Sequence, residues 1–388
     1  MSLYQKASLV QIPSGYKAAD AKLYSVVPNS GDGDFTVSSD ADATRVNKDG
    51  LVETTVANQA RLNYDPTNPQ DPHLLLEPTR TNNILQSNDP SGANWTDPLS
   101  RWTLLTDTTT APDGGTVRII ELTESGGSLI RLTGFSIAAA TYTVSFYIKD
   151  IDGNLTGGNV DIGDEGSGVP SPAFGDVGSE WVRATRTITT TGTKSHMDLQ
   201  PTFSGSTNKV AIWGVQLEAG SYATSLIPTS GSAVTRTVDT CGDAGNSTII
   251  KAEGGLFVDF TTSNTDNFKR IYIISNADFN NAIFIQLLNS SMTVQIVSGG
   301  TTLYSWSFTV NLSDRHKIAI RYKQGDSNLY YNGTQKTAST ASGSWFSEGL
   351  LNKFTFSPSS FFNFYGEIYQ GMVFDQTIND TELQTLTT

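Results

Sequence analysis

Histidine is the scarcest residue capable of acid–base chemistry in this chain of 388 residues. The histidines are His73, His196 and His316, so a Ser-His-Asp triad would have to use one of them. The sequence holds no Gly-x-Ser-x-Gly elbow, no His-Glu-x-x-His pair and no Gly-x-x-x-x-Gly-Lys phosphate loop. We therefore interpret the three histidines as ordinary surface residues and predict that the protein is not an enzyme.

Carboxylates offer a second kind of chemistry. Asp161, Asp164 and Glu165 form a dense acidic cluster in the Gly/Pro/Asp-rich segment 152–178, which is interpreted as one long loop. Calcium prefers carboxylate and carbonyl oxygens, so these three residues are candidate ligands of a structural calcium ion, with a solvated acidic loop as the alternative. No other cofactor is expected. Glycoside hydrolysis needs only two carboxylates, so a polysaccharide-degrading enzyme stays open as an alternative.

Aromatic residues point to sugar binding, because sugar rings have apolar faces that stack on aromatic side chains. Trp345 and Phe346 follow the small residues 341–344 and are expected on a loop. Tyr365 ends the aromatic run 361–365, which would form either an exposed platform or a subunit interface. Trp345, Phe346 and Tyr365 are the predicted glycan-binding residues, and core packing is the alternative for each.

Composition narrows the class of protein. The net charge of −13 disfavours a nucleic-acid partner, since phosphate contacts need clustered Lys and Arg. Cys241 stands alone, which excludes an intramolecular disulfide and any multi-cysteine metal site. No apolar run approaches 18 residues and the first residues lack the apolar stretch of a secretory signal. We therefore expect synthesis in the cytoplasm without membrane insertion.

The elements that position these residues are expected to be β-strands. Residues 142–148 alternate between apolar and polar, and strand-like runs recur about every ten residues after residue 256. Asn332-Gly333 predicts a tight hairpin with two positive φ angles. Near the end of the chain, Asn379 and the acidic residues that follow predict the start of a short helix over 380–386.

The first ninety residues differ from the rest. A hairpin is expected around the turn 47–50, and the four prolines between residues 66 and 78 predict a semi-rigid connector. The expected fold is therefore all-β, with an N-terminal extended segment over 1–92 and two antiparallel β-sandwich (jelly-roll) domains over 93–240 and 241–388.

One set of motifs lies between residues 40 and 240, at residues 43–47, 50–53, 74–78, 80–82, 213–220, 222–229 and 234–236. A second set lies near the end of the chain, at residues 366–368, 373–375 and 380–383. The first set resembles modular bacteriophage virion appendages of the head-fibre and tail-fibre class, and the middle region resembles a carbohydrate-binding-module jelly roll. The second set resembles the last strand and helix of a concanavalin-A or laminin-G-like sandwich.

The resemblance implies a structural virion protein, often a homotrimer, whose N-terminal region docks on capsid, neck or tail proteins. Arg45, Asn47, Glu77 and Arg80 lie in the matching motifs and are the predicted anchoring and assembly residues. The sandwiches would then face host cell-surface glycans. A capsid or neck decoration that only packs against other virion proteins is the structural alternative.

Overall fold

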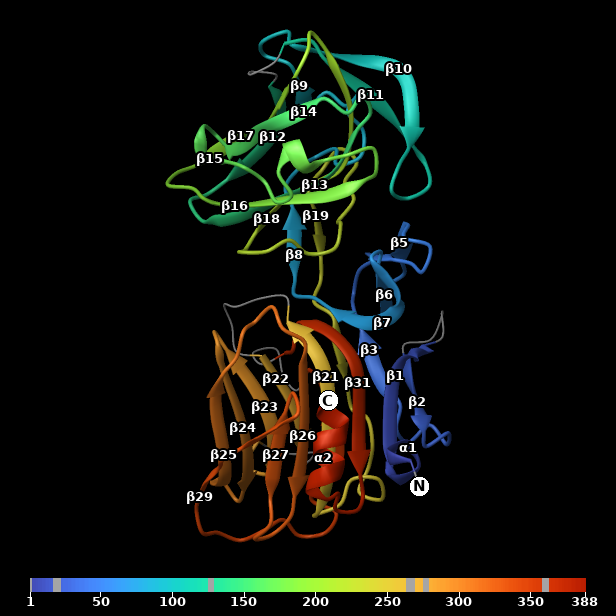
Figure 1. Ribbon diagram of the computed structural model, residues 1–388, viewed down its shortest axis with the longest axis vertical. Helices are drawn as coiled ribbons and strands as arrows, with labels where there is room; N and C mark the ends of the chain where they lie inside the picture. Colours follow the sequence, from blue (N-terminus) through green and yellow to red (C-terminus); the bar gives the residue numbers. More distant parts are fainter. Residues whose placement is uncertain (1, 17–21, 125–128, 263–268, 275–278, 358–362) are drawn as a thin grey trace. The chain divides into compact units, whose positions relative to one another are not determined.

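The computed structural model describes residues 2–16, 22–124, 129–262, 269–274, 279–357 and 363–388. The chain divides into two compact units (Figure 1). The first unit combines residues 1–41, 55–78 and 238–388, and the second combines residues 42–54 and 79–237. Both are built from antiparallel strands, which confirms the all-β prediction. Within the described residues, no helix has the length and apolar character needed to cross a membrane.

The second unit is a β-sandwich with a main hydrophobic core and a smaller second cluster that includes Val52 and Trp213. One sheet has the strand order β10-β11-β18-β13-β16, and the facing sheet has the order β15-β14-β17-β12-β9. Smaller ribbons pair β4 with β5 and β8 with β19. The bounds are β4 Ala43–Val46, β5 Val52–Thr55, β8 Arg80–Asn82, β9 Trp95–Thr96, β10 Trp102–Thr110, β11 Thr116–Leu122, β12 Ile130–Ile137, β13 Thr141–Asp150, β14 Leu155–Ile162, β15 Glu165–Gly168, β16 Val182–Thr189, β17 Lys194–Phe203, β18 Asn208–Ala219 and β19 Val234–Arg236.

The alternation predicted for residues 142–148 is confirmed in β13. Tyr142, Val144, Phe146 and Ile148 are all buried between the two sheets. Full burial of such a side chain contributes roughly 1.5–3 kcal/mol. The segment 152–178, in contrast, is not one long loop, because it contains β14, β15 and a short 3-10 helix over Phe174–Asp176.

The first unit is also a β-sandwich. Its larger sheet runs β20-β3-β2-β1-β31-β21-β26-β27-β28, and the facing sheet runs β29-β25-β24-β23-β22-β30 (Figure 1). The bounds are α1 Leu3–Lys6, β1 Leu9–Tyr16, β2 Lys22–Val27, β3 Phe35–Ser38, β6 Arg61–Asp65, β7 Asn68–Leu76, β20 Thr240–Gly242, β21 Gly254–Thr262, β22 Lys269–Ile274, β23 Ala282–Leu288, β24 Ser291–Ser298, β25 Thr301–Thr309, β26 His316–Tyr322, β27 Asn328–Tyr331, β28 Thr334–Lys336, β29 Ser339–Thr340, β30 Lys353–Thr355, β31 Gly366–Phe374 and α2 Asp380–Thr387.

The N-terminal residues are part of this sandwich. One edge of β31 pairs with β1, where Val10 faces Met372, and also with β7, where Leu75 faces Glu367. The other edge of β31 pairs with β21. The structure therefore divides the chain differently from the expected boundaries at 92 and 240, because partners from opposite ends of the sequence complete one sheet.

The proline-rich stretch is a hairpin instead of a connector. β6 and β7 pair antiparallel, with Leu62 opposite Leu74. Pro69 and Pro72 lie in the part of β7 that precedes its pairing with β31, where a missing backbone N–H costs no ladder hydrogen bond to that strand.

Two local predictions are confirmed in the first unit. Asn332 (φ 44°) and Gly333 (φ 78°) form the turn between β27 and β28. Asn379 caps α2: its side chain accepts a hydrogen bond from the Glu382 backbone N–H at 3.0 Å, and the Glu382 carboxylate accepts one from the Asn379 N–H at 2.9 Å. The helix packs on β26 and β27 through Leu383.

Candidate functional site: a groove at the edge of the first unit

A groove of about 800 Å³ opens at one side of the first unit, between residues of the edge strands β28 and β29. This volume lies in the range of small-molecule and oligosaccharide sites, roughly 300–1,000 Å³. Its lining comes from both sheets and from the start of α2. We call it the edge groove and use six of its residues below: Tyr304, Arg321, Asp326, Asn328, Gln335 and Trp345.

One wall of the edge groove is aromatic. Trp345 is half-buried, and its indole N–H donates to the Ala252 carbonyl at 2.8 Å, which fixes the orientation of the ring. Tyr304 meets Trp345 edge to face, with ring centroids 6.4 Å apart, and stacks on the buried Trp306 at 5.7 Å. The two lining rings are therefore held by packing before any ligand arrives.

The opposite wall is polar and centred on Arg321. Its guanidinium donates to Asp326 at 2.8 Å and to Asp380 at 2.6 Å. Asn328 donates to the same Asp380 oxygen at 3.1 Å and accepts a hydrogen bond from Gln335 at 3.0 Å. Such a network, formed within the protein, leaves its remaining donors and acceptors at fixed positions for a ligand.

The structure places the three predicted glycan-binding residues in different surroundings. Trp345 lines the edge groove. Phe346 is 5% exposed and packs in the core of the first unit, which leaves no face for a sugar. Tyr365 is half-buried just before β31 and is not among the described residues that line the groove. Phe361 and Phe362, from the same aromatic run, lie outside the described residues.

The three predicted calcium ligands also separate. Asp161 is buried on β14, and Asp164 lies in the β14–β15 turn with its side chain 80% exposed. Glu165 binds Lys194 at 2.9 Å and accepts from the Thr191 N–H at 2.9 Å. These contacts lower the pKa of Glu165 to about 2, with the Thr191 hydrogen bonds as the largest cause. The structure therefore gives Glu165 different partners from Asp161 and Asp164.

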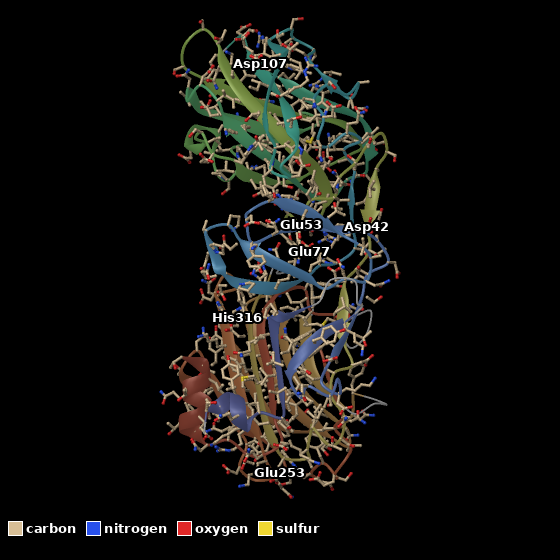
Figure 2. The ribbon with its side chains drawn as sticks, turned by 90° about the vertical axis from the view of Figure 1, so that its right-hand side faces the viewer. Asp42, Glu53, Glu77, Asp107, Glu253 and His316 are labelled. Carbon is tan, nitrogen blue, oxygen red and sulfur yellow. The ribbon has the colours of Figure 1, made fainter. Side chains whose placement is uncertain are left out.

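Two predicted anchoring residues, Arg45 and Asn47, stabilise the β4–β5 hairpin. Both donate to Glu53, from Arg45 Nε at 2.7 Å and from Asn47 Nδ2 at 3.0 Å. Burial opposes ionisation of Glu53, but the Asn47 and Arg45 hydrogen bonds outweigh it and lower the pKa of Glu53. Glu53 is labelled in Figure 2.

Glu77, also labelled in Figure 2, directly follows β7 and is buried. It accepts a hydrogen bond from Arg61 at 2.6 Å, and Arg61 makes a second ion pair with Asp239. Burial opposes the charge of Arg61, but the two carboxylates outweigh it and raise the pKa of Arg61. Glu77 therefore takes part in a buried ion-pair network within the first unit.

Arg80 and the motif 213–220 form a second buried network, in the second unit. Arg80 lies 3.8 Å from Glu218, which is fully buried and accepts from the Thr224 N–H and hydroxyl at 2.7 Å each. Asn82 donates to the carbonyl oxygens of Val215 and Ile227. In the described structure these motif residues hold strands and loops of the sandwich together, which gives them a structural role; a role in docking stays a prediction.

The expectation that all histidines are surface residues is wrong for two of them. His73 is 2% exposed and His316 is fully buried, whereas His196 is partly exposed. His73 bonds Asn63 at 2.9 Å and His316 bonds the Tyr331 hydroxyl at 3.1 Å. Both lie on strands that neighbouring elements cover. Their burial could not be predicted from the sequence, because prolines near His73 and charged residues beside His316 suggested exposed positions. Cys241 is buried, and burial raises the pKa of its thiol.

Most of the polar wall was not predicted from the sequence. Arg321 is the penultimate residue of β26, Asp326 lies in the following turn and Asp380 begins α2, so three separate elements converge there. The available signal was the helix cap at Asn379, which places Asp380 in the first turn, but nothing local pairs that turn with Arg321.

No known protein-family model matches the sequence, and no curated protein matches it. Solved structures share its β-sandwich architecture at low similarity. A carbohydrate-binding module (CBM40) of the Ruminococcus gnavus IT-sialidase, bound to α2,3 sialyllactose, is 14% identical with a TM-score of 0.32, over 38% of this chain and 94% of that chain.

Two further structures are similar over more of this chain. Domains LG4-5 of the mouse laminin α1 chain are 13% identical with a TM-score of 0.27, covering 71% of this chain and 95% of that one. The tripod from the baseplate of bacteriophage Tuc2009 is 13% identical with a TM-score of 0.24, covering 72% and 99%. At these scores the functions of those proteins are not carried over, and the edge groove must be judged by its own residues.

Proposed function

We propose that this chain is a non-enzymatic structural protein of a bacteriophage particle that binds host-surface glycans through the edge groove. The observation that supports glycan binding is the pairing of a fixed aromatic wall, Tyr304 and Trp345, with a preformed polar wall around Arg321.

A sugar ring presents an apolar face and a rim of hydroxyl groups that both donate and accept. The aromatic wall suits the apolar face. The polar wall suits the rim, because it combines carboxylate and amide oxygens with guanidinium and amide N–H groups. Asp326 and Asp380 have half-exposed side chains, so each retains acceptor capacity toward the groove.

The arrangement of the carboxylates supports binding without hydrolysis. A glycosidase needs one carboxylic acid that carries a proton and a second carboxylate that acts as base or nucleophile. In the edge groove, Asp326 and Asp380 both accept hydrogen bonds from the guanidinium of Arg321. We therefore expect host polysaccharide to remain intact after prolonged incubation, and release of reducing sugar would contradict the proposal.

Membership of a phage particle rests on the sequence resemblance of residues 40–240. Mass spectrometry of purified particles from the phage that encodes the chain is expected to detect it, and light scattering of the full-length protein is expected to give a trimer. A particle that lacks the chain would contradict the virion assignment. A trimer that binds no glycan would favour the purely structural decoration.

The glycan site is tested by a glycan array followed by calorimetry on the full chain. Trp345→Ala is expected to weaken binding about fivefold or more, since stacking of one aromatic contributes on the order of 1 kcal/mol or more. Gln335→Ala, an exposed polar substitution on the opposite wall, is expected to weaken binding more modestly.

Tyr4→Ala is the matched control, because Tyr4 is an aromatic side chain of the same unit that is 54% exposed and is not among the described groove-lining residues. Binding that survives both groove substitutions, or that Tyr4→Ala abolishes equally, would show that glycans bind elsewhere. Circular dichroism on each variant separates lost binding from lost folding.

A further inference from the structure

Four charged or ionisable side chains share one face of a sheet in the second unit. Asp198 on β17 lies directly opposite Arg131 on β12 and directly opposite Asp161 on β14. His196 is two residues from Asp198 on the same strand, so it points to the same face. This placement is set by strand register and brings together residues far apart in the sequence.

Asp164 reaches this face from the β14–β15 turn. Gly163 and Asp164 have φ angles of 58° and 64°, the pair of positive values that a two-residue type I′ turn requires. The turn carries the Asp164 carboxylate to 3.7 Å from His196 Nε2. Its side chain is 80% exposed, which leaves an open approach for an ion from solvent.

The three groups lie close enough for side-chain movement to bring them around one metal ion. One atom each from Asp164, His196 and Asp198 lie within 4.8 Å of one another, and His196 Nε2 is 3.9 Å from Asp198. Ligands about 2.1 Å from a metal ion stand roughly 3.0–3.4 Å apart in octahedral or tetrahedral geometry. The separations therefore exceed this spacing by a few tenths of an ångström up to about 1.8 Å, and movement of the exposed Asp164 side chain would complete such a set.

A separate observation concerns unsatisfied buried atoms. Asp161 is 4% exposed, and its Oδ1 has no hydrogen-bond partner among the described residues, although Oδ2 accepts from Gln200. His196 Nε2 is likewise a buried atom without a hydrogen-bond partner in the described structure. A buried polar atom of this kind needs a partner, and an ion held by Asp164 and Asp198 would supply one to His196 Nε2.

The charge balance leaves room for a divalent cation. Arg131 binds Asp198 through two hydrogen bonds, at 2.8 and 2.7 Å, and its Nη2 also lies 3.8 Å from Asp164. One guanidinium therefore faces three carboxylates, and the group keeps a net negative charge when they are ionised. Each Asp198 oxygen keeps a second lone pair beside its bond to Arg131, so the ion pair does not prevent coordination.

We propose that Asp164, His196 and Asp198 form a binding site for a divalent transition-metal ion of the zinc class. Asp161 lies beside them, on β14 opposite Asp198. The imidazole nitrogen favours such an ion over calcium, which prefers oxygen ligands alone. The bound ion joins the β14–β15 turn to β17 and so stabilises that end of the second unit. This site is independent of the edge groove and its glycans.

The proposal is tested on the full chain after dialysis against EDTA. Titration calorimetry with Zn²⁺ is expected to show one tight site, and Ca²⁺ is expected to bind more weakly. His196→Gln and Asp164→Asn are each expected to weaken the tight Zn²⁺ site about tenfold or more. Binding of Co²⁺ is expected to give a visible absorption band that His196→Gln changes.

Asp176→Asn is the matched control, since Asp176 is an exposed carboxylate of the same unit outside the cluster. It should leave Zn²⁺ affinity unchanged. Absence of a tight site in the wild-type chain, calcium binding tighter than zinc, or a tight site unaffected by both ligand substitutions would each overturn the proposal. Glycan binding by the same samples reports on the edge groove separately.

Discussion

Arg61 and Arg321 belong to the same unit and each binds two carboxylates, yet their surroundings differ. The Arg61 side chain is 1% exposed, and its partners Glu77 and Asp239 are each 5% exposed. The Arg321 side chain is 11% exposed, while Asp326 and Asp380 are 53% and 50% exposed. A buried charge that loses its partner finds no water to replace it, whereas a half-exposed one does. The same ion-pair chemistry therefore holds buried groups together at Arg61, whereas at Arg321 it leaves half-exposed carboxylates that, in the proposed function, would contact a ligand.

The largest effect is expected from Arg61→Met. This substitution leaves Glu77 and Asp239 buried without their cation, so the free energy of unfolding should fall by about 3–5 kcal/mol. Urea unfolding followed by circular dichroism measures the change. A decrease of less than about 1 kcal/mol in the free energy of unfolding would show that the Arg61 ion pairs stabilise the fold no more than those of Arg321.

Arg321→Met is the matched substitution in the edge groove. Its carboxylate partners can be solvated, so the free energy of unfolding should change by less than about 1 kcal/mol. Glycan affinity should nevertheless fall about tenfold, because the polar wall loses its central donor. Calorimetry and urea unfolding on the same preparation separate the two effects. A large loss of stability with unchanged affinity would reverse the roles proposed here.

The smallest effect is expected from His73→Gln, which should change how the stability of the first unit depends on pH. Like Arg61, His73 is a buried ionisable residue of this unit. Burial lowers the pKa of His73, outweighing the opposing influence of Glu367 and Asp71. The unfolded chain therefore takes up a proton first as pH falls below about 6.5, so the first unit loses stability on acidification. Each extra proton contributes at most about 1.4 kcal/mol per pH unit. Urea unfolding between pH 7 and pH 5 should be flatter for His73→Gln, and an unchanged slope would assign the acid sensitivity to other groups.

The sequence was sufficient to predict turns, helix caps and single strands, because a few consecutive residues determine each of them. The Asn332-Gly333 turn, the Asn379 cap and the alternation of β13 each depend on a few consecutive residues. The place of the N-terminal strands depends on pairing between Val10 and Met372, and no short window of sequence contains both. That is why residues 1–92 were expected to form a separate segment.

The same reasoning explains the mixed outcome for functional residues. Trp345 follows a run of small residues, a local signal, and the structure places it in a groove. The acidic cluster was grouped by closeness in sequence, but Glu165 and Asp164 separate at the β14–β15 turn. His196 and Asp198 join Asp164 only through the register of β17 against β14, which a single sequence does not specify.

The pairing of β31 with strands from the start of the chain has a consequence for synthesis. β1 and β7 leave the ribosome long before β31, the strand that pairs with both. Residues 79–237 emerge in between, so the second unit can fold before the last strands of the first unit have been synthesised. A nascent or prematurely terminated chain that stops before residue 366 thus exposes the edges of β1, β7 and β21 together, and such unpaired edges are sites for aggregation.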